Sequence, residues 1–369
     1  MPKLATAEGT HRYAARFADR AAAGHFREQA STGLQLSSIG IGTYLGEPDA
    51  ATDVGYTLAV VTAVEGGINL VDTAINYRFQ RSERSIGAAL QELAAKGIAR
   101  DEIVLCTKAG FLTPDGEMPG DANEYFVREY LQPGVFRPED IAADCHCMAT
   151  PYLADQLARS LKNLGVESID VFYLHNPETQ LAAISRELFM QRLRDAFEFL
   201  EHEVAAGRIG AYGLATWNGF RQQRGARDFL SLEEMIGAAR AVAGEAHHFR
   251  FVQLPFNLAM PEALTLVNQT MDGRQGSTLQ AARALGITVV SSAALLQGQL
   301  TKNLPPFVSA ALGLKNDLQR AMQFARSTPG VTSALVGMSR PEHVRENLEI
   351  IGVEPAAREQ YLKIFERGH

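Results

Sequence analysis

The sequence predicts an α/β fold and, within that class, a (β/α)8 TIM barrel. Three observations support this prediction. Short apolar runs typical of strands recur eight times, helical segments separate most of them, and no G-x-G-x-x-G loop follows an early run. Consecutive strands that are joined through helices run parallel, because each crossover needs a helix. Eight such units fit a closed barrel better than an open dinucleotide-binding sheet.

The expected strands are spread along the chain from residue 38 onward. They cover residues 38–42, 68–71, 103–107, 169–174, 211–214, 251–254, 288–290 and 333–336. The second one, INLV, is bounded upstream by two glycines and ends directly before Asp72. A charge at the end of a buried strand needs a partner, since an unpaired one is expensive to bury.

The helices between these strands carry recognisable end signals. In TPYLADQLARSLKNLG, residues 150–165, four leucines spaced for one helical face predict an amphipathic helix. We expect Thr150 at the N-cap, Pro151 at the first helical position and Gly165 just beyond the end.

Two segments exceed a minimal barrel. We expect one domain over residues 1–369, with an N-terminal extension at 1–33 and a loop insertion at 112–150 after the third strand. The insertion is rich in glycine and proline, and long excursions of this kind are usually lids or binding loops.

Composition restricts the class of protein. With 35 Lys+Arg against 42 Asp+Glu, the formal charge of −7 argues against a nucleic-acid or anionic-membrane surface. No apolar run approaches the ~20 residues of a membrane span. Three cysteines give no disulfide framework, and the N-terminus lacks the features of a signal or transit peptide. We therefore expect a cytoplasmic protein.

Polar residues end several predicted strands, and in this fold the carboxyl ends of the strands form the active site. The residues in question are Asp72 with Tyr77 in the following loop, Lys108, His175 with Asn176, and Gln253. Each has a structural interpretation, such as a simple Asp72–Lys108 ion pair. The convergence of four of them, Asp72, Tyr77, Lys108 and His175, on one barrel mouth favours a reacting constellation.

The chemistry that would use this constellation is general acid catalysis. A free tyrosine, with a pKa of about 10, is a poor proton donor to a carbonyl oxygen. An ammonium at ~4 Å is worth roughly 4 kcal/mol at an effective dielectric of 20 and would lower that pKa. We expect Lys108 to activate Tyr77 in this way, Asp72 to hold Lys108, and His175 to orient the substrate oxygen.

Four stretches resemble the aldo-keto reductase superfamily. They are GINLVDTAINYRFQRSERSIGAAL, VLCTKAG, SLKNLGVESIDVFYLHNPE and GMSRPEHVRENL, in the family's order. The resemblance implies that Tyr77 donates the proton, with Asp72, Lys108 and His175 in support. It also implies reversible reduction of aldehydes and ketones by a nicotinamide dinucleotide, NADP rather than NAD, bound in extended form across the barrel mouth.

The resemblance assigns cofactor contacts to residues that follow the later strands. These are Thr216, Gln253, Ser292, Ser339, Arg340, Glu346 and Asn347. Two departures from the family pattern stand out. The usual G-x-S-N after the fifth strand is Gly-Leu-Ala-Thr here, ending at Thr216. The aromatic that often stacks on the nicotinamide is replaced by Ser292, which leaves Trp217 as a substitute.

Other functions stay open at this stage. The triplet Cys145-His146-Cys147 could bind a metal, but its spacing is unlike zinc sites, and we interpret it as loop packing beside the substrate pocket. Lys108 could be the nucleophile of a Schiff-base aldolase, although a lysine paired with Asp72 stays protonated. A cofactor-binding regulatory subunit with little turnover is the remaining alternative, because the usual nicotinamide contacts are altered.

Overall fold

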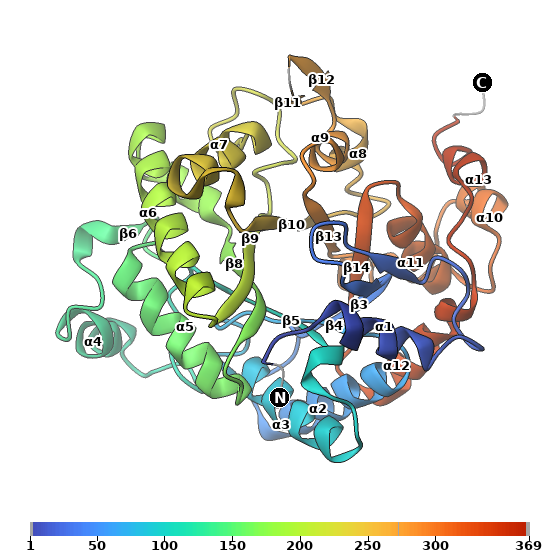
Figure 1. The fold of residues 1–369 in the computed structure, drawn as a ribbon, viewed down its shortest axis with the longest axis horizontal. Coiled ribbons are helices and arrows are strands. Elements are labelled where there is room, and N and C mark those ends of the chain that lie inside the picture. Colours follow the sequence, from blue (N-terminus) through green and yellow to red (C-terminus); the bar gives the residue numbers. More distant parts are fainter. Residues whose placement is uncertain (1–2, 272, 367–369) are drawn as a thin grey trace.

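A closed barrel of eight parallel strands forms the centre of the molecule (Figure 1). The computed structural model describes residues 3–271 and 273–366. Around the barrel the strands are β3 (Ile39–Gly42), β4 (Leu70–Asp72), β5 (Val104–Ala109), β8 (Ile169–His175), β9 (Ile209–Ala215), β10 (Phe249–Pro255), β13 (Thr288–Ser292) and β14 (Val331–Gly337), which returns to β3. Each predicted strand overlaps one of these, so the predicted (β/α)8 fold is confirmed.

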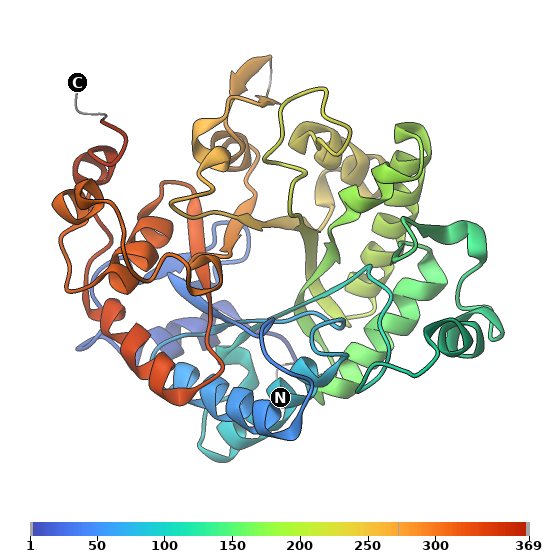
Figure 2. The same cartoon turned by 180° about the vertical axis from the view of Figure 1, so that it is seen from behind.

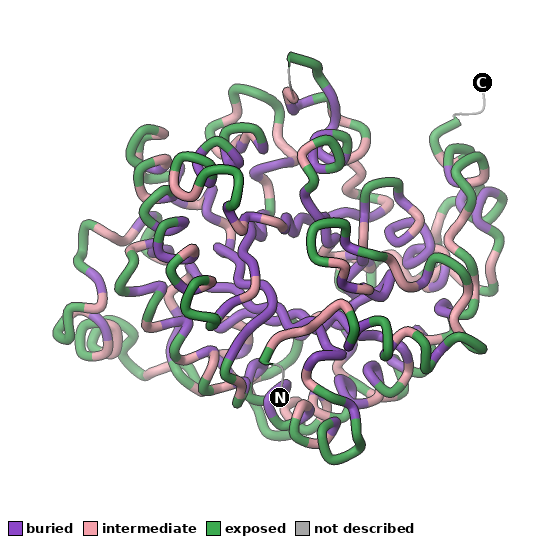
Figure 3. The backbone as a smooth tube through the Cα atoms, viewed as in Figure 1, coloured by how far each residue is buried: buried purple, intermediate pink, exposed green. Residues whose placement is uncertain are grey.

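Helices cover the outside of the barrel. Those of seven or more residues are α1 (Ala7–Ala15), α2 (Ala50–Glu65), α3 (Arg81–Ala95), α5 (Thr150–Leu164), α6 (Arg186–Ala205), α7 (Leu232–Ala243), α9 (Thr278–Ala284), α10 (Pro306–Leu312), α11 (Asp317–Ser327) and α12 (Pro341–Leu348). Shorter ones are α4 (Ala122–Phe126), α8 (Glu262–Thr265) and α13 (Arg358–Leu362). The backbone is buried along the strands and exposed on the outer helix faces (Figure 3).

The end signals of α5 are only partly as predicted. Gly165 ends the helix in the left-handed region, with φ of 65°, as glycine at this position usually does. The prediction of Thr150 as N-cap is wrong, because Ala149 occupies that position and makes no side-chain bond. Thr150 is instead the first helical residue, one position before the proline.

The N-terminal part of the chain closes one end of the barrel, and the segment that does so extends beyond the predicted extension of 1–33 to residue 37. A hairpin of β1 (Phe26–Glu28) and β2 (Gln35–Ser37) contributes Leu34 and Leu36 to the cluster of side chains inside the barrel. The backbone N–H of Ala5 donates to Asp170 at the start of β8, at 2.6 Å. This end faces the viewer in Figure 1, and Figure 2 shows the opposite end, where the active site of such a barrel is expected.

Most of the 112–150 segment lies on the flank of the barrel, beside α5 and α6 (Figure 1). It contains α4, a π-helical turn (Val127–Leu131), and a small hairpin of β6 (Ile141–Ala142) and β7 (His146–Cys147). It has its own apolar cluster around Tyr130 and Phe136. Only its two ends reach the barrel, where the N–H of Cys147 donates to the carbonyl of Gly110 at 2.8 Å.

A third hairpin, of β11 (Gln269–Met271) and β12 (Arg274–Gly276), lies between α8 and α9 in the chain. Among the residues that the structure describes, no helix is both long enough and apolar enough to cross a membrane.

Candidate active site

A buried ion pair lies at the carboxyl ends of β4 and β5. Lys108 Nζ is 2.5 Å from Asp72 Oδ1 and also donates to the carbonyl of Thr73 at 2.7 Å. From β10, Gln253 Nε2 donates to the second carboxylate oxygen of Asp72 at 2.7 Å. Burial, the largest single influence, lowers the pKa of Lys108, but Asp72 and Tyr77 together raise it by more, so the net direction is upward. The lysine is therefore an ammonium at neutral pH.

The ring of Tyr77 packs against the lysine of this pair. The ammonium of Lys108 is 4.9 Å from the centre of the tyrosine ring. The ring packs edge-to-face against Tyr44 at 5.0 Å and against His175 at 5.7 Å. Burial raises the pKa of Tyr77, and Lys108 lowers it only in part. The prediction that the pKa of Tyr77 is lowered overall is therefore wrong. The cost of removing the phenolate from water exceeds the stabilisation of the phenolate by the nearby ammonium.

The backbone after Tyr77 makes an uncommon turn. Residues 78–80 all have positive φ angles, of 50°, 56° and 70°, although none is glycine. The guanidinium of Arg78 is buried and holds this turn, donating to the carbonyl of Glu47 at 2.9 Å and pairing with Asp53 at 2.6 Å. A left-handed conformation costs roughly 1–2 kcal/mol per residue, so these contacts offset a real strain next to the tyrosine.

His175 ends β8 and closes the other side of the cluster. Its Nδ1 is 3.1 Å from Oδ1 of Asn76, the residue before Tyr77. Burial, followed by the neighbouring Lys108, lowers the pKa of His175 well below its ordinary value. The imidazole is therefore neutral at neutral pH, and it can hydrogen-bond a neutral oxygen without adding charge to the site.

His146 holds the backbone of His175 in place, a role that the sequence did not indicate. Its Nε2 donates to the backbone carbonyl of His175 at 2.7 Å, and its Nδ1 is 3.1 Å from Nε2 of Gln180. The ring of Phe111 packs against both histidines, at 5.2 and 5.1 Å. A Cβ on Gly110 would lie 2.6 Å from His146 Nε2, so only glycine fits there. Burial lowers the pKa of His146 to about 4.

The other predicted site residues lie along four neighbouring strands, from β9 to β14. Thr216 follows β9, Gln253 is in β10 and Ser292 ends β13. The remaining four come from the loop after β14 and from α12, namely Ser339, Arg340, Glu346 and Asn347. Arg340 and Glu346 are exposed and Ser339 and Ser292 are half-buried. The structure thus gathers these residues on one arc of the mouth, beside the Asp72–Lys108 pair.

A family model described as aldo/keto reductase family matches residues 38–306. The chain belongs to this family. As an aldo-keto reductase it is an oxidoreductase that acts on aldehydes or ketones with a nicotinamide cofactor.

Several relatives match this reductase over much of its length. It is 26% identical over 341 residues to D-threo-aldose 1-dehydrogenase from a Pseudomonas species, covering 88% of this chain and 92% of the relative. Over 191 residues it is 29% identical to the NADH-specific methylglyoxal reductase of Escherichia coli, covering 50% of each. A Schizosaccharomyces pombe protein provisionally named voltage-gated potassium channel subunit beta is 22% identical over 339 residues, 88% of each chain.

Solved structures agree with the fold of this reductase. The glycerol dehydrogenase of Gluconobacter oxydans superposes with a TM-score of 0.64 at 18% identity, covering 94% of this chain and 95% of that one. An aldo-keto reductase from Bacillus halodurans in its holo form gives 0.62 at 16% identity, covering 92% and 95%.

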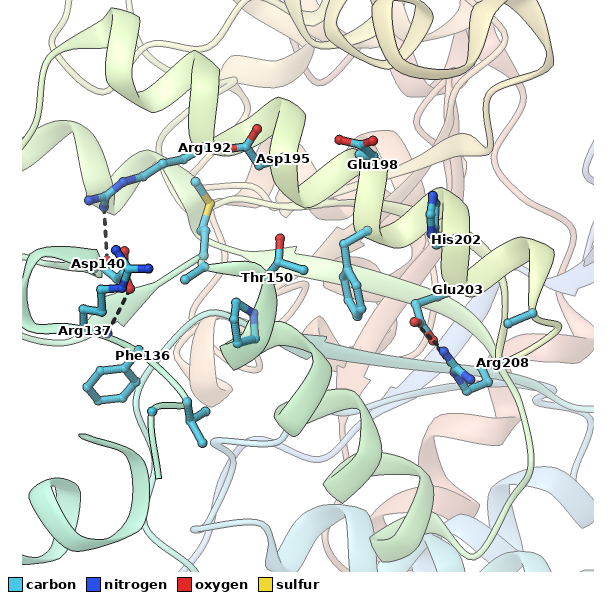
Figure 4. A pocket seen from close by; sticks show the side chains of 17 residues that line it. Phe136, Arg137, Asp140, Thr150, Arg192, Asp195, Glu198, His202, Glu203 and Arg208 are labelled. Carbon is cyan, nitrogen blue, oxygen red and sulfur yellow. Dashed lines mark hydrogen bonds and ion pairs between the residues drawn. The ribbon is translucent and has the colours of Figure 1, made fainter. Parts of the chain in front are cut away.

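A hollow of about 850 Å³ lies outside the barrel wall of this aldo-keto reductase, between the 112–150 segment and α6 (Figure 4). Some of its charged groups have partners: Arg208 pairs with Glu203, and Arg192 donates to the carbonyl of Asp140 at 3.1 Å. None of the residues that line it belongs to the Tyr77 cluster. The hollow is therefore separate from the cluster at the barrel mouth.

The two cysteines flanking His146 are in different environments. Cys147 is buried in the apolar cluster of the flank segment, whereas Cys145 is half-buried. Burial raises the pKa of both thiols, which disfavours the thiolate form that a metal would need. Within residues 3–271 and 273–366, no group of three histidine, cysteine or acidic side chains is placed to hold a metal ion.

Proposed function

We propose that this aldo-keto reductase reduces an aldehyde or ketone to an alcohol, reversibly, with Tyr77 as general acid. The observation that carries this proposal is the stacking of a proton-bearing phenol over a buried ammonium, beside a neutral histidine. A general acid must hold its proton until the substrate oxygen gains negative charge. The raised pKa of Tyr77 keeps the proton on the phenol until then. Lys108 stabilises the phenolate that the transfer leaves behind.

The roles of the other residues follow from their positions. His175 hydrogen-bonds the substrate oxygen and directs it toward the Tyr77 hydroxyl. Asp72 accepts from Lys108 on β5 through Oδ1 and from Gln253 on β10 through Oδ2. Side chains from two other strands therefore fix the carboxylate that holds the ammonium. When bound, reduced nicotinamide supplies the hydride. Proton delivery is then the step that this chain's own side chains perform.

Buried polar atoms without partners support the fit of a dinucleotide. The hydroxyl of Thr216 and Oδ1 of Asn347 are buried and lack a hydrogen-bond partner among the described residues. Buried groups of this kind usually have a partner, and a bound ligand would supply one. In our proposal Thr216 binds the carboxamide of the nicotinamide together with Gln253 and Ser292.

At the adenosine end we assign Ser339, Arg340, Glu346 and Asn347. Glu346 and Asn347 would bind the adenine side, and Ser339 with Arg340 would bind a 2′-phosphate. A guanidinium recognises phosphate through charge-assisted bonds, which favours NADPH over NADH.

The test is oxidation of NADPH and of NADH by the purified protein, followed by absorbance over a panel of aldehydes, ketones and sugar-derived carbonyls. We expect turnover with at least one carbonyl class, faster with NADPH. Absence of turnover, together with absence of cofactor binding by calorimetry, would contradict the proposal.

A regulatory subunit that binds the cofactor with little turnover is the second candidate. Two observations favour it: the Leu-Ala-Thr sequence before Trp217 in place of the usual contacts, and the S. pombe relative. Tight NADPH binding with no turnover on the whole panel would support it over the enzyme. The Schiff-base aldolase is disfavoured by the raised pKa of Lys108, and borohydride trapping with a carbonyl should leave Lys108 unmodified.

A further inference from the structure

The short turn after β8 carries a second acidic residue that the proposed chemistry does not use. It begins with His175, continues through Asn176 in the left-handed region with φ of 46°, and reaches Glu178 after Pro177. The N–H of Asn176 donates to the carbonyl of Ala215 at 2.6 Å, which ties the turn to the end of β9. His175 and Glu178 are therefore positioned by one rigid turn.

The carboxylate of Glu178 binds the backbone of the loop after β9. Its Oε1 accepts from three consecutive N–H groups, those of Trp217, Asn218 and Gly219, at 2.7, 3.0 and 3.2 Å. Consecutive N–H groups that converge in this way form a concave site for an anion. The side chain is buried, and Oε2 has no partner among the described residues.

The carbonyl groups of the same three loop residues are bound by other partners. Arg221 donates to the first carbonyl through Nη1 at 3.0 Å and to the second through its backbone N–H at 2.6 Å. The N–H of Leu230 donates to the third at 2.8 Å. Glu178 is thus the acceptor that holds the donor side of the 217–219 loop.

We propose that Glu178 is a positioning residue that fixes the 216–219 loop for the nicotinamide end of the cofactor. The proposal rests on the function proposed above, in which Thr216 binds the carboxamide. Thr216 itself is anchored on its strand side, since its N–H donates to the carbonyl of Gln253 at 2.8 Å. Three charge-assisted bonds to Glu178 immediately afterwards fix where the threonine hydroxyl and the half-exposed Trp217 ring point.

The chain offers a direct probe of this loop. Trp217 is its only tryptophan, so intrinsic tryptophan fluorescence reports on the loop alone. We would compare Glu178→Ala and Glu178→Gln with the parent and with Glu198→Gln, an exposed change on α6. Without cofactor, acrylamide quenching of Trp217 should rise at least twofold in Glu178→Ala. It should rise less in Glu178→Gln, whose amide oxygen can still accept, and not at all in Glu198→Gln.

Kinetics then separate positioning from catalysis. In Glu178→Ala the KM for NADPH should rise about tenfold or more, while kcat at saturating NADPH stays within about threefold. Glu178→Gln should restore most of the lost affinity, and circular dichroism confirms that each variant is folded. If Glu178→Ala fails to fold, Glu178→Gln decides through the same two measurements.

Two results would overturn the role of Glu178. The first is Trp217 quenching in Glu178→Ala equal to that of the parent, and the second is a fall in kcat with an unchanged KM for NADPH. A parent protein that binds no nicotinamide would instead overturn the proposed function. The quenching experiment needs no cofactor, so the two failures are distinguishable.

Discussion

The two ends of the barrel each contain a buried acid–base pair, and the pairs differ in what surrounds them. At the mouth Lys108 pairs with Asp72 at 2.5 Å, and at the closed end Arg100 pairs with Asp170 at 2.8 Å. Both acids lie on barrel strands and are almost fully buried. One carboxylate–cation motif therefore occurs twice, with different neighbours.

The pair at the closed end is surrounded by backbone. Asp170 accepts from the N–H groups of Ala5 and Leu105, at 2.6 and 2.7 Å. Arg100 also donates to the carbonyls of Ile103 and Ser168, at 2.7 and 3.0 Å. This pair ties together the N-terminal segment and two strands through bonds to backbone groups.

The pair at the mouth instead faces a side chain. Lys108 uses two of its three donors on Asp72 and Thr73, and the side chain that lies over the ammonium is Tyr77. The comparison indicates that a buried ion pair becomes chemically useful when one donor stays directed at a group that can exchange a proton. The following predictions test this difference, beginning with the largest expected effect.

Tyr77→Phe should lower kcat by about 10²–10⁴, the range for a positioned general acid. The change removes only the hydroxyl, so the edge-to-face packing with Tyr44 and His175 is kept. The dissociation constant for NADPH should change little. Steady-state rates and calorimetry check this, and a fully active Tyr77→Phe enzyme would falsify our assignment of the acid.

Lys108→Met and Arg100→Met should separate the two ends. The first should lower kcat at least 100-fold, because the phenolate loses its cation and Asp72 its partner. The second should lower the free energy of unfolding by about 3 kcal/mol, the low end for a broken buried pair, since Arg100 is partly exposed. Its kcat should stay near that of the parent. Urea unfolding and initial rates measure both, and a large loss of kcat in Arg100→Met would refute the division of roles.

Two buried histidines extend the comparison to pH. Burial lowers the pKa of His25, near the closed end, and of His146, near the mouth, to about 4 in each case. Between pH 6.5 and 4 the unfolded chain binds protons there that the folded chain does not. The free energy of unfolding should therefore fall as pH falls through this window, by up to about 1.4 kcal/mol per pH unit for each histidine.

Single variants assign this pH effect to its sources. His25→Gln and His146→Gln should each make the decline of the unfolding free energy with falling pH less steep, as measured by urea unfolding at several pH values. Only His146→Gln should also change kcat, because only His146 contacts the carbonyl of His175. An unaltered pH profile in both variants would contradict the linkage.

Arg340→Ala should have the smallest effect. Loss of one charge-assisted contact to a 2′-phosphate should raise the dissociation constant for NADPH about tenfold, while that for NADH stays unchanged. Isothermal calorimetry with both cofactors measures this. Glu342→Gln, an exposed position in the helix α12 that follows Arg340, is the matched control. Equal affinities of the parent for the two cofactors would count against the assignment.

The sequence predicted the eight strands and the Asp72–Lys108–Tyr77–His175 cluster because both depend on local patterns. Apolar runs separated by helices specify strands, and strand ends specify the mouth. The closing hairpin was missed because β1 and β2 have three residues each and show no alternation. Its role depends on contacts of Leu34 and Leu36 with side chains inside the barrel, most of which lie far away in the sequence.

The supporting residues could not be predicted for a related reason. Glu178 was visible as the end of LHNPE, yet its acceptor role needs three N–H groups about forty residues later. His146 was interpreted as part of a loop triplet, and only the folded chain brings it beneath His175. The direction of the Tyr77 pKa was also wrong, because the cost of burial cannot be read from spacing.

The left-handed turn at residues 78–80 has a consequence for how this protein can change. Glycine adopts positive φ without strain, so Phe79→Gly would relax the backbone locally. It would also allow other conformations there and widen the range of directions in which the Tyr77 hydroxyl points. Selection for thermostable variants should therefore enrich substitutions at residues 78–80, and we expect these substitutions to lower the reaction rate. At this turn, thermal stability and a fixed orientation of the Tyr77 hydroxyl place opposite demands on the same three residues.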